Sequence, residues 1–211
     1  LTILAWNEQG LGDQIMYGSM FDELSQYVKK LIVRIDKRLI NIFRYTHPQI
    51  TFVNSEDLID ERNYDKHIPF GHIGNHIRLS KESFKNSLSP YVHCNSKTKK
   101  FILDKYKEKN NLLVGLSWSS ANHLISNYKS LSLEILYPIL RIKNIKFLNL
   151  EYKVKTNELN SFYDKFGIKI FKEETIDNFF DIEGLSSLID ACDFVISCSN
   201  TNAHLSGALF K

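Results

Sequence analysis

The stretch from Asp193 to Leu209, D-F-V-I-S-C-S-N-T-N-A-H-L-S-G-A-L, constrains the fold of this chain most. Its apolar, β-rich start, Phe194–Ile196, predicts a buried strand, and its end, from Ala203 onward, predicts a closely packed helix. The small or polar residues Ser197–Thr201 leave only a tight turn between them. A strand–turn–helix unit points backbone N–H groups and a helix N-terminus at one spot, which attracts phosphate. We therefore expect an α/β domain in which this turn either binds phosphate or is an ordinary connection.

Side chains at this turn favour the phosphate interpretation. Asn200, Thr201 and Asn202 are residue types that cap a helix and also donate to phosphate oxygens. His204 is expected in the first helical turn, where it either faces a diphosphate or simply packs against its neighbours.

Composition limits the class of protein. With 211 residues, of which 43% are hydrophobic, the chain is long enough for one large or two small domains. The net charge is only +3, and lysines and arginines are scattered among acidic residues, so we expect a solvated surface and no nucleic-acid partner.

The compartment is predicted from cysteines and from the lack of long apolar runs. Cys94, Cys192 and Cys198 show no paired spacing, which favours a reducing compartment. No run approaches membrane-spanning length and no signal peptide is evident. We expect a cytoplasmic protein, or one at the inner membrane surface, with no transmembrane segment. The start at Leu1 and the stop directly after a helix suggest a fragment of a longer protein.

A second strand–turn–helix unit opens the chain. The apolar run Leu1–Trp6 predicts a strand, followed by a turn and a helix that carries Ile15 to Leu24. Gly10 and Gly12 let the backbone come close to a ligand or to another element. The third position of the dinucleotide fingerprint G-x-G-x-x-G is Ile15, and no P-loop Gly-Lys-Ser/Thr follows. The turn therefore matches neither motif.

Asp13 stands at the mouth of the first strand and at a helix N-terminus. It is either the N-cap of that helix or a general base, and the spacing alone favours the cap.

The rest of the first half alternates strands and helices. We expect strands at Leu31–Ile35 and Ile50–Val53 and helices at Arg38–Tyr45, Ser83–Leu88 and Ser96–Glu108. The run Lys66–Gly71 predicts a short strand and loop that brings His67, His72 and His76 near one another. Their spacing fits no standard metal site, so we expect a substrate-facing loop or plain surface and no metal.

The second half repeats the alternation after a boundary at Asn110–Asn111. We expect strands at Leu112–Trp118, Ile145–Leu150 and Ile168–Phe171, and helices at Leu133–Ile142, Glu158–Phe166 and Asp181–Ala191. This pattern predicts two Rossmann-like domains with parallel sheets, residues 1–109 and 110–211.

Ligands of open parallel sheets bind at the carboxyl ends of the strands. Asp13, Ser119, Glu151 and Asn200 fall at such ends, and a cleft between facing domains would bring them together. Lys129 lies in the polar loop after Trp118, where it is either solvated or neutralises a diphosphate.

Four segments carry a family likeness. The chain resembles bacterial glycosyltransferase-like domains found behind tetratricopeptide repeats, which are related to ADP-heptose:lipopolysaccharide heptosyltransferases and, more distantly, to O-linked N-acetylglucosamine transferases. The segments are E-Q-G-L-G-D at 8–13, V-G-L-S-W-S-S at 114–120 with N-Y-K-S-L-S-L at 127–133, F-L-N-L-E-Y at 147–152, and D-I-E-G-L-S-S-L-I-D-A-C-D-F-V-I-S at 181–197 with N-A-H-L-S-G-A-L at 202–209.

The resemblance implies the GT-B fold and inverting transfer from a nucleotide-diphosphate sugar to a glycan, lipid-linked or protein acceptor, with no metal and no other cofactor. It implies Asp13 as the base that takes the acceptor's proton. It implies that the donor is bound by Gly12, Ser119, Ser120, Lys129, Glu151, Asn200, Thr201, Asn202 and His204. Lys129 and the backbone around 201–204 would stabilise the departing diphosphate.

One departure from the family leaves the sugar open. Heptosyltransferases carry an acidic residue followed by Thr or Ser at the positions of Ser199 and Asn200. This difference favours the alternative of a non-catalytic GT-B scaffold that acts as a binding module in a repeat protein. A nicotinamide-dependent reductase is a third alternative, which the missing third glycine disfavours.

Overall fold

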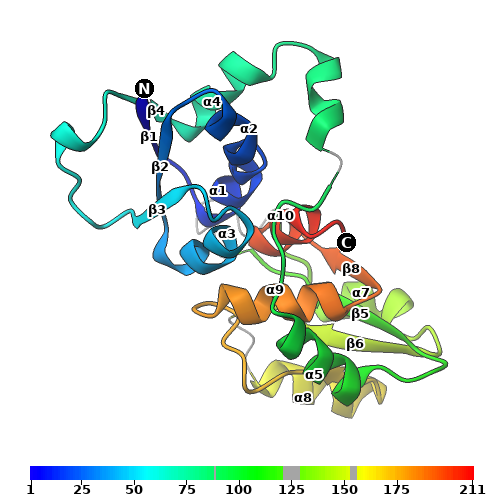
Figure 1. Ribbon diagram of the computed structural model, residues 1–211. Helices are drawn as coiled ribbons and strands as arrows, with labels where there is room; N and C mark the ends of the chain where they lie inside the picture. The colour runs from blue at the N-terminus through cyan, green and yellow to red at the C-terminus, as the bar shows by residue number, and fades with distance from the viewer. Residues whose placement is uncertain (88, 121–128, 153–155) are drawn as a thin grey trace. The chain divides into compact units, whose positions relative to one another are not determined.

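The computed structural model describes residues 1–87, 89–120, 129–152 and 156–211. The chain forms two compact units, Leu1–His93 and Cys94–Leu209, and each contains one four-stranded sheet with all strands parallel (Figure 1). The prediction of an α/β chain with two Rossmann-like sheets is confirmed.

The first unit has the strand order β3-β2-β1-β4. Its strands are β1 (Thr2–Trp6), β2 (Lys30–Ile35), β3 (Thr51–Asn54) and β4 (Lys66–Pro69), and its helices are α1 (Leu11–Gly18), α2 (Phe21–Gln26), α3 (Ile40–Thr46) and α4 (Phe70–Ile77). Three 3-10 segments complete it, at Lys37–Leu39, Glu61–Asn63 and Lys81–Ser87. Phe21 forms the centre of the core, because its ring lies 5.0–6.3 Å from the rings of Phe43, Phe52 and Phe70.

The second unit has the order β7-β6-β5-β8. Its strands are β5 (Leu112–Ser117), β6 (Ile145–Asn149), β7 (Ile170–Phe171) and β8 (Phe194–Ser197). Its helices are α5 (Ser96–Tyr106), α7 (Leu133–Leu140), α8 (Thr156–Phe166), α9 (Ile182–Ala191) and α10 (Thr201–Ala208).

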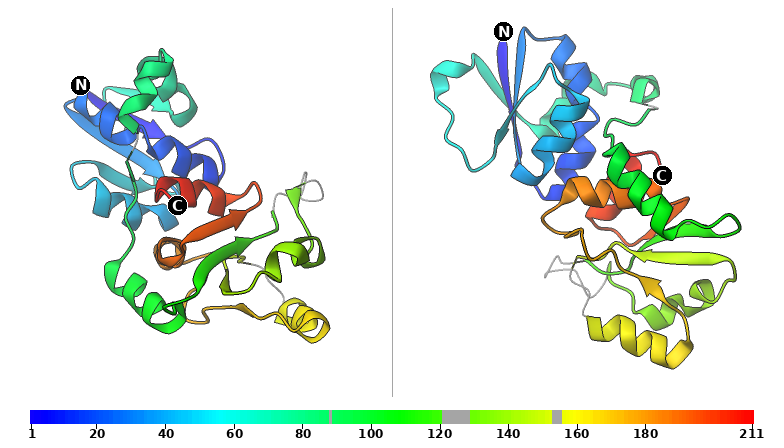
Figure 2. Two further views of the ribbon diagram at one scale, coloured as in Figure 1. Left: turned by 90° about the vertical axis from the view of Figure 1, so that its right-hand side faces the viewer. Right: turned by 60° about the horizontal axis from the view of Figure 1, so that its bottom comes forward.

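Alternating side chains build the layers of the second unit. Val114 and Leu116 of β5 point into an apolar cluster with Leu136 of α7 and Phe162 of α8. Gly115, between them, faces the other way, where an added Cβ would lie 3.3 Å from the Cys192 sulfur at the end of α9. Accordingly, α8 and α9 lie on opposite faces of the sheet in both views (Figures 1 and 2).

Both sheets therefore share one topology, in which the first strand of the unit lies between the second and the fourth. The order in which successive strands are added to the sheet reverses between β1 and β4, and again between β5 and β8. Such switch points open a crevice at the carboxyl ends of the two strands, and ligands of parallel α/β sheets bind there.

Several predicted element boundaries are shifted by one or two residues, and two predicted elements of the first unit differ more from the structure. The single helix expected over Ile15–Leu24 is two helices, because the Ser19 hydroxyl and N–H both donate to the Met16 carbonyl and end α1. The segment from Phe70, which was expected to be a loop, is helix α4. In its first turn the Gly71 N–H donates to the Glu8 carboxylate at 3.3 Å.

The predicted domain boundary at residues 109/110 differs from the division after His93. The reason is the packing of α5, which the prediction assigns to the first domain. Lys99 of α5 forms an ion pair with Asp190 of α9 at 2.8 Å, and Cys94 donates to the same carboxylate. Leu88, the expected end of a helix, and residues 121–128 of the polar loop lie outside the described residues.

Candidate functional site

Asn200 fixes the start of helix α10 at the switch point of the second unit. Its side-chain oxygen accepts from the N–H groups of Asn202 at 2.9 Å and Ala203 at 3.4 Å, so it is the N-cap. Its amide nitrogen donates to the Ser117 hydroxyl at 2.6 Å and to the Ser119 carbonyl at 2.8 Å. The cap therefore ties the helix to the end of β5 and aims its N-terminus at the crevice.

Ser117, the last residue of β5, is the centre of this network. Its hydroxyl donates to Glu151 at 2.8 Å and accepts from Asn200 at 2.6 Å and Asn202 at 2.9 Å. One donor and two acceptor positions are all that a hydroxyl has, so each is used. Asn202 is only 4% exposed and donates also to the Leu150 carbonyl at 3.0 Å. The hydroxyl oxygen of Ser117 thus links the carboxyl end of β5 to Glu151, just after β6, and to the start of α10.

Glu151 holds the turn after β5. Its carboxylate, in a residue 4% exposed, accepts from the Ser119 N–H at 2.7 Å and from the hydroxyls of Ser119 at 2.7 Å and Ser117 at 2.8 Å. Buried carboxylates persist where such donors replace water. Ser120 follows, half-buried, with its N–H on the Ser130 hydroxyl at 3.0 Å.

Lys129 brings a positive charge to the same edge. Its ammonium donates to the Ser199 hydroxyl at 3.3 Å, across from the loop after β5 to the loop after β8. Within the described part of the chain no carboxylate lies in ion-pair contact with it. Burial raises the pKa of the neighbouring Cys198 thiol, and the Glu151 carboxylate raises it further, so this thiol stays neutral. Lys129 and the N-terminus of α10 together make an anion-attracting edge.

Thr201 and His204 occupy the start of α10 as predicted from the sequence. Thr201 is the first residue of the helix and His204 lies one turn later, and both are half-buried. The structure therefore brings Ser119, Glu151, Asn200 and Asn202 into one network, with Lys129 beside it. Gly12 and Asp13 belong to the first unit.

Asp13 is not the N-cap that its spacing favours. The cap position of α1 is Gly10, which offers no side-chain hydrogen bond, and Asp13 lies in the first helical turn. Gly12 precedes it there. Among the described residues the Asp13 carboxylate has no hydrogen-bond or ion-pair partner, and the residue is half-buried. A carboxylate that caps nothing remains available at the carboxyl end of β1.

Long-range contacts hold the turn around Asp13. Gln14, 4% exposed, donates to the Gln9 carbonyl at 3.1 Å and accepts from the Asp36 N–H at 2.9 Å. Glu8 reaches the N-terminus of α4, where an added Cβ on Gly71 would lie 2.6 Å from the Glu8 Oε1 atom. A side chain at position 71 would therefore displace the Glu8 carboxylate from its present position.

The three histidines of the first unit are separated by structure. His67 lies on β4, where its Nδ1 atom accepts from the Trp6 indole at 3.2 Å, whereas His72 and His76 lie on α4. Within the described ranges, no group of three or more His, Cys, Asp or Glu side chains is arranged to hold a metal. No helix among these residues is both long and apolar enough to cross a membrane.

Sequence reasoning missed Ser117 and Glu8. Ser117 carries a usable signal, because it is a polar residue inside the apolar run Leu112–Trp118, at the carboxyl end of a strand. Glu8 belongs to the family-like segment 8–13, but its contact with Gly71, far along the chain, has no local sequence signal.

No family model matches this chain. Among curated proteins it is similar to Protein FlbA of Caulobacter vibrioides, with 25% identity over 226 aligned residues. The alignment covers 98% of this chain but 38% of that protein, so the chain spans well under half the length of this relative.

Solved glycosyltransferases share the fold. A glycosyl transferase family 9 protein of Veillonella parvula superposes with a TM-score of 0.72 at 11% identity, over 99% of this chain and 78% of that one. The E. coli heptosyltransferase WaaC with ADP-2-deoxy-2-fluoro heptose superposes at 0.59 with 12% identity, over 100% and 87%. The iron-containing glycosyltransferase TibC of enterotoxigenic E. coli superposes at 0.62 with 12% identity, over 98% and 56%. These likenesses show the GT-B-like fold expected from the sequence.

Proposed function

We propose that this chain is the core of a glycosyltransferase that moves a sugar from a nucleotide-diphosphate donor to an acceptor hydroxyl. The observation that carries the proposal is the anion-attracting edge of the second unit, where Lys129 lies 3.3 Å from Ser199 beside the capped N-terminus of α10. A diphosphate is the group that such an edge attracts. The similarity to solved glycosyltransferases supports the same class of donor.

In this proposal the diphosphate leaves as an anion that the second unit stabilises. Lys129 supplies a full charge, and the N–H groups around Thr201–His204 supply the positive end of a helix dipole. Asn200 and Asn202 act as positioning residues, because their amides are engaged with Ser117, Ser119 and Leu150. Glu151 likewise fixes the turn that presents Ser119 and Ser120.

The acceptor is activated by the first unit in this mechanism. The Asp13 carboxylate, which has no partner among the described residues, takes the proton of the acceptor hydroxyl as the oxygen attacks the anomeric carbon, and Gly12 leaves room for the ligand beside it. Attack opposite the leaving diphosphate inverts the anomeric centre. We propose that these groups suffice without a metal. Because TibC contains iron, activity after chelation tests this point directly.

We further propose a reducing, cytoplasmic setting and an acceptor that is a glycan, a lipid-linked glycan or a protein. Three free cysteines support the setting. The choice of these acceptor classes is supported by the resemblance to repeat-associated glycosyltransferase domains.

The test is transfer by the wild type and by Asp13→Asn, with a panel of nucleotide sugars and with Asp104→Asn, an exposed acid of α5, as the matched control. We expect Asp13→Asn to lose transfer by about 100-fold or more while nucleotide binding is nearly unchanged, because a general base contributes on this scale. The control should keep full activity. Equal activity of Asp13→Asn and wild type contradicts the proposal.

A second function, a non-catalytic binding module in a repeat protein, is favoured by Ser199 and Asn200, which replace the acidic residue and the Thr or Ser of heptosyltransferases. This alternative predicts that the wild type binds no nucleoside diphosphate. It also predicts that Lys129→Ala and His204→Ala change no measurable property.

A further inference from the structure

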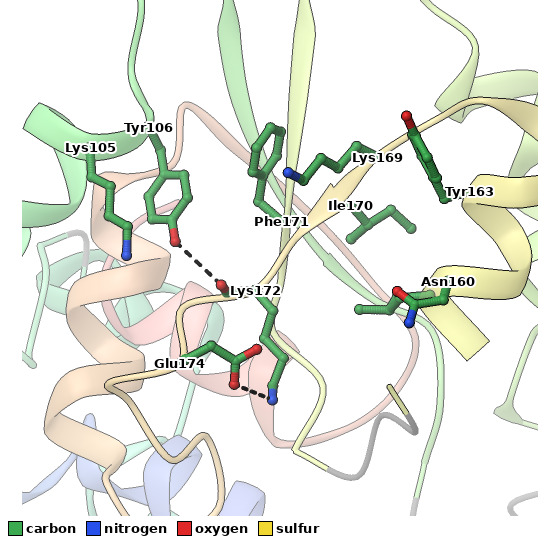
Figure 3. A pocket seen from close by; sticks show the side chains of 10 residues that line it. Lys105, Tyr106, Asn160, Tyr163, Lys169, Ile170, Phe171, Lys172 and Glu174 are labelled. Carbon is green, nitrogen blue, oxygen red and sulfur yellow. Dashed lines mark hydrogen bonds and ion pairs between the residues drawn. The ribbon is translucent and has the colours of Figure 1, made fainter. Parts of the chain in front are cut away.

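Apart from the candidate site, the second unit contains a pocket at the edge strand β7, with a volume of about 710 Å³ (Figure 3). Its apolar walls come from Ile170 and Phe171 of β7 and from Leu159 and Tyr163 of α8. Polar residues also line it, namely Lys105, Lys169, Lys172, Asn160 and Glu174, and the three lysines are called the lysine rim below. The pocket therefore combines apolar walls with a lining that carries three lysines and one carboxylate, so its net charge is positive.

Buried contacts hold this pocket in shape. Tyr106, 5% exposed, donates to the Lys172 carbonyl at 3.3 Å and to Glu173 at 3.0 Å. The Lys169 ammonium lies 4.9 Å from the centre of the Phe171 ring (Figure 3). Lys105 and Lys172 are paired with Glu173 and Glu174 at 2.7 Å each, whereas Lys169 has no carboxylate partner among the described residues. Lys169 is thus the rim charge that is available to a ligand.

The first unit carries the complementary shape. The segment from Ser55 to Asp65 joins β3 to β4 and projects from the sheet of that unit (Figure 1). It contains five acidic residues and a single basic one, Arg62. Leu58, within this segment, is 99% exposed. A leucine this exposed, flanked by Asp57 and Glu56, is an apolar knob inside an acidic loop.

This loop has a defined local structure. On one side of Leu58, the Asn54 side chain accepts from the Glu56 N–H at 3.2 Å, and the Asn54 carbonyl accepts from the Asp57 N–H at 3.0 Å. On the other side, Asp60 caps a 3-10 turn by accepting from the Arg62 N–H at 2.9 Å. Order of this kind lowers the entropy lost on binding. Within the described part of the chain, Glu56, Asp57 and Glu61 have no ion-pair partner.

We propose that the occupant of the β7 pocket is a second copy of this chain, which inserts Leu58 between Ile170 and Tyr163 and sets its acidic flanks against the lysine rim. Lysines on an edge strand commonly serve only to block strand pairing. That role does not explain the apolar walls behind Lys169, nor an exposed leucine whose neighbours carry the opposite charge. The loop and the pocket are different surfaces, so the contact is head-to-tail.

A contact built on one loop belongs to the smallest class of interfaces, below about 1,200 Å², so self-association is expected to be weak and dependent on concentration. It should weaken further between about 0.05 M and 0.5 M salt, because the charges at the rim are exposed and screened.

The test is sedimentation of the full chain and two variants over a range of concentrations. Leu58→Ser disables the loop, and Lys169→Glu disables the pocket. Each should weaken self-association by about tenfold or more, the factor that corresponds to one buried leucine. Both positions are exposed, so the fold should persist, and Leu79→Ser and Lys143→Glu are the matched exposed controls that should associate like the wild type.

Mixing the two variants gives the decisive result. The Leu58→Ser copy keeps an intact pocket and the Lys169→Glu copy an intact loop, so the mixture should form one-to-one pairs that neither variant forms alone. A monomeric wild type overturns the proposal and leaves the pocket to another protein. Variants that associate like the wild type, or a mixture that stays monomeric, overturn it as well.

Discussion

The Lys129 ammonium donates to the Ser199 hydroxyl over 3.3 Å and so joins the loops that follow β5 and β8. These strands flank the switch point of the second sheet. Because Ser199 is neutral, no carboxylate of the described residues pairs with the charge of Lys129 beside the N-terminus of α10. An acidic residue at 199 would pair with that charge. The serine therefore leaves this edge more attractive to an anion.

Replacing Asn200 by alanine should lower the free energy of unfolding of the second unit by about 1–3 kcal/mol. The change removes an N-cap and two donations that link α10 to β5. Urea unfolding followed by circular dichroism measures the loss. Thr201→Ala, at the next position, is the control and should change stability by less than about 0.5 kcal/mol. Equal losses in the two variants would contradict the assigned network.

Substitutions at Glu151 test whether this residue only positions its neighbours or contacts the nucleotide directly. In Glu151→Gln the amide oxygen still accepts from Ser117 and the Ser119 N–H, while the Ser119 hydroxyl turns to accept from the new amide. We expect a loss of unfolding free energy below about 1 kcal/mol, against about 2–4 kcal/mol for Glu151→Ala, which leaves buried donors unpaired. Calorimetric titration with a nucleoside diphosphate should give nearly unchanged affinity for the glutamine variant. A large loss of affinity would mean that the carboxylate itself contacts the ligand.

Two glycine-to-alanine changes should shift stability in opposite directions. A Cβ at Gly18 would lie 2.3 Å from the buried Phe43 ring, so Gly18→Ala should cost about 1–3 kcal/mol. At Gly207, inside α10, no described atom lies within 4 Å of an added Cβ, so Gly207→Ala should stabilise by about 0.5–1 kcal/mol. Urea midpoints of both variants beside the wild type test this prediction. A stabilised Gly18→Ala would show that the Phe43 ring is free to move aside.

Acid should weaken the second unit through Glu173. Burial raises the pKa of Glu173, but donation from Lys105, Thr175 and Tyr106 outweighs burial and lowers the pKa to about 2, from an ordinary value of 4.5. Because the folded pKa lies below the unfolded one, this stabilisation is complete above about pH 4.5 and is lost as the pH falls toward 2. Unfolding free energies of wild type and Glu173→Gln should therefore differ most near pH 6, differ less at pH 3, and converge only as the pH falls through about 2. A gap that does not change with pH would contradict this role.

The two parallel sheets were predictable because they follow from short-range patterns, whereas the strand order was not predicted. Apolar runs such as Leu112–Trp118 alternate with helical periodicity, and such alternation favours parallel strands with crossover helices. The N-cap role of Asn200 was predictable too, since the residue directly precedes a helix. In both cases the neighbouring residues contain the whole signal.

Other features depend on contacts between distant residues. Helix α4 begins where a loop was expected, and the Gly71 N–H in its first turn donates to the distant Glu8 carboxylate. Asp13 does not cap helix α1, because Gly10 occupies the N-cap position without any side-chain hydrogen bond. Helix α5 belongs to the second unit because Lys99 reaches Asp190. Local sequence patterns do not predict contacts between residues that lie far apart in the sequence.

The most direct test of the account is nucleotide binding at the second unit. A thermal-shift panel of ADP, UDP, GDP and CMP, with NAD as control, would be run on wild type, Lys129→Ala and the matched exposed-lysine variant Lys143→Ala. The account predicts that one nucleoside diphosphate at about 100 times its Kd stabilises the wild type by about 2.7 kcal/mol. It predicts the same for Lys143→Ala and a loss of about tenfold or more in affinity for Lys129→Ala. Stabilisation by none of the nucleoside diphosphates, or an equal response of Lys129→Ala, would contradict the account.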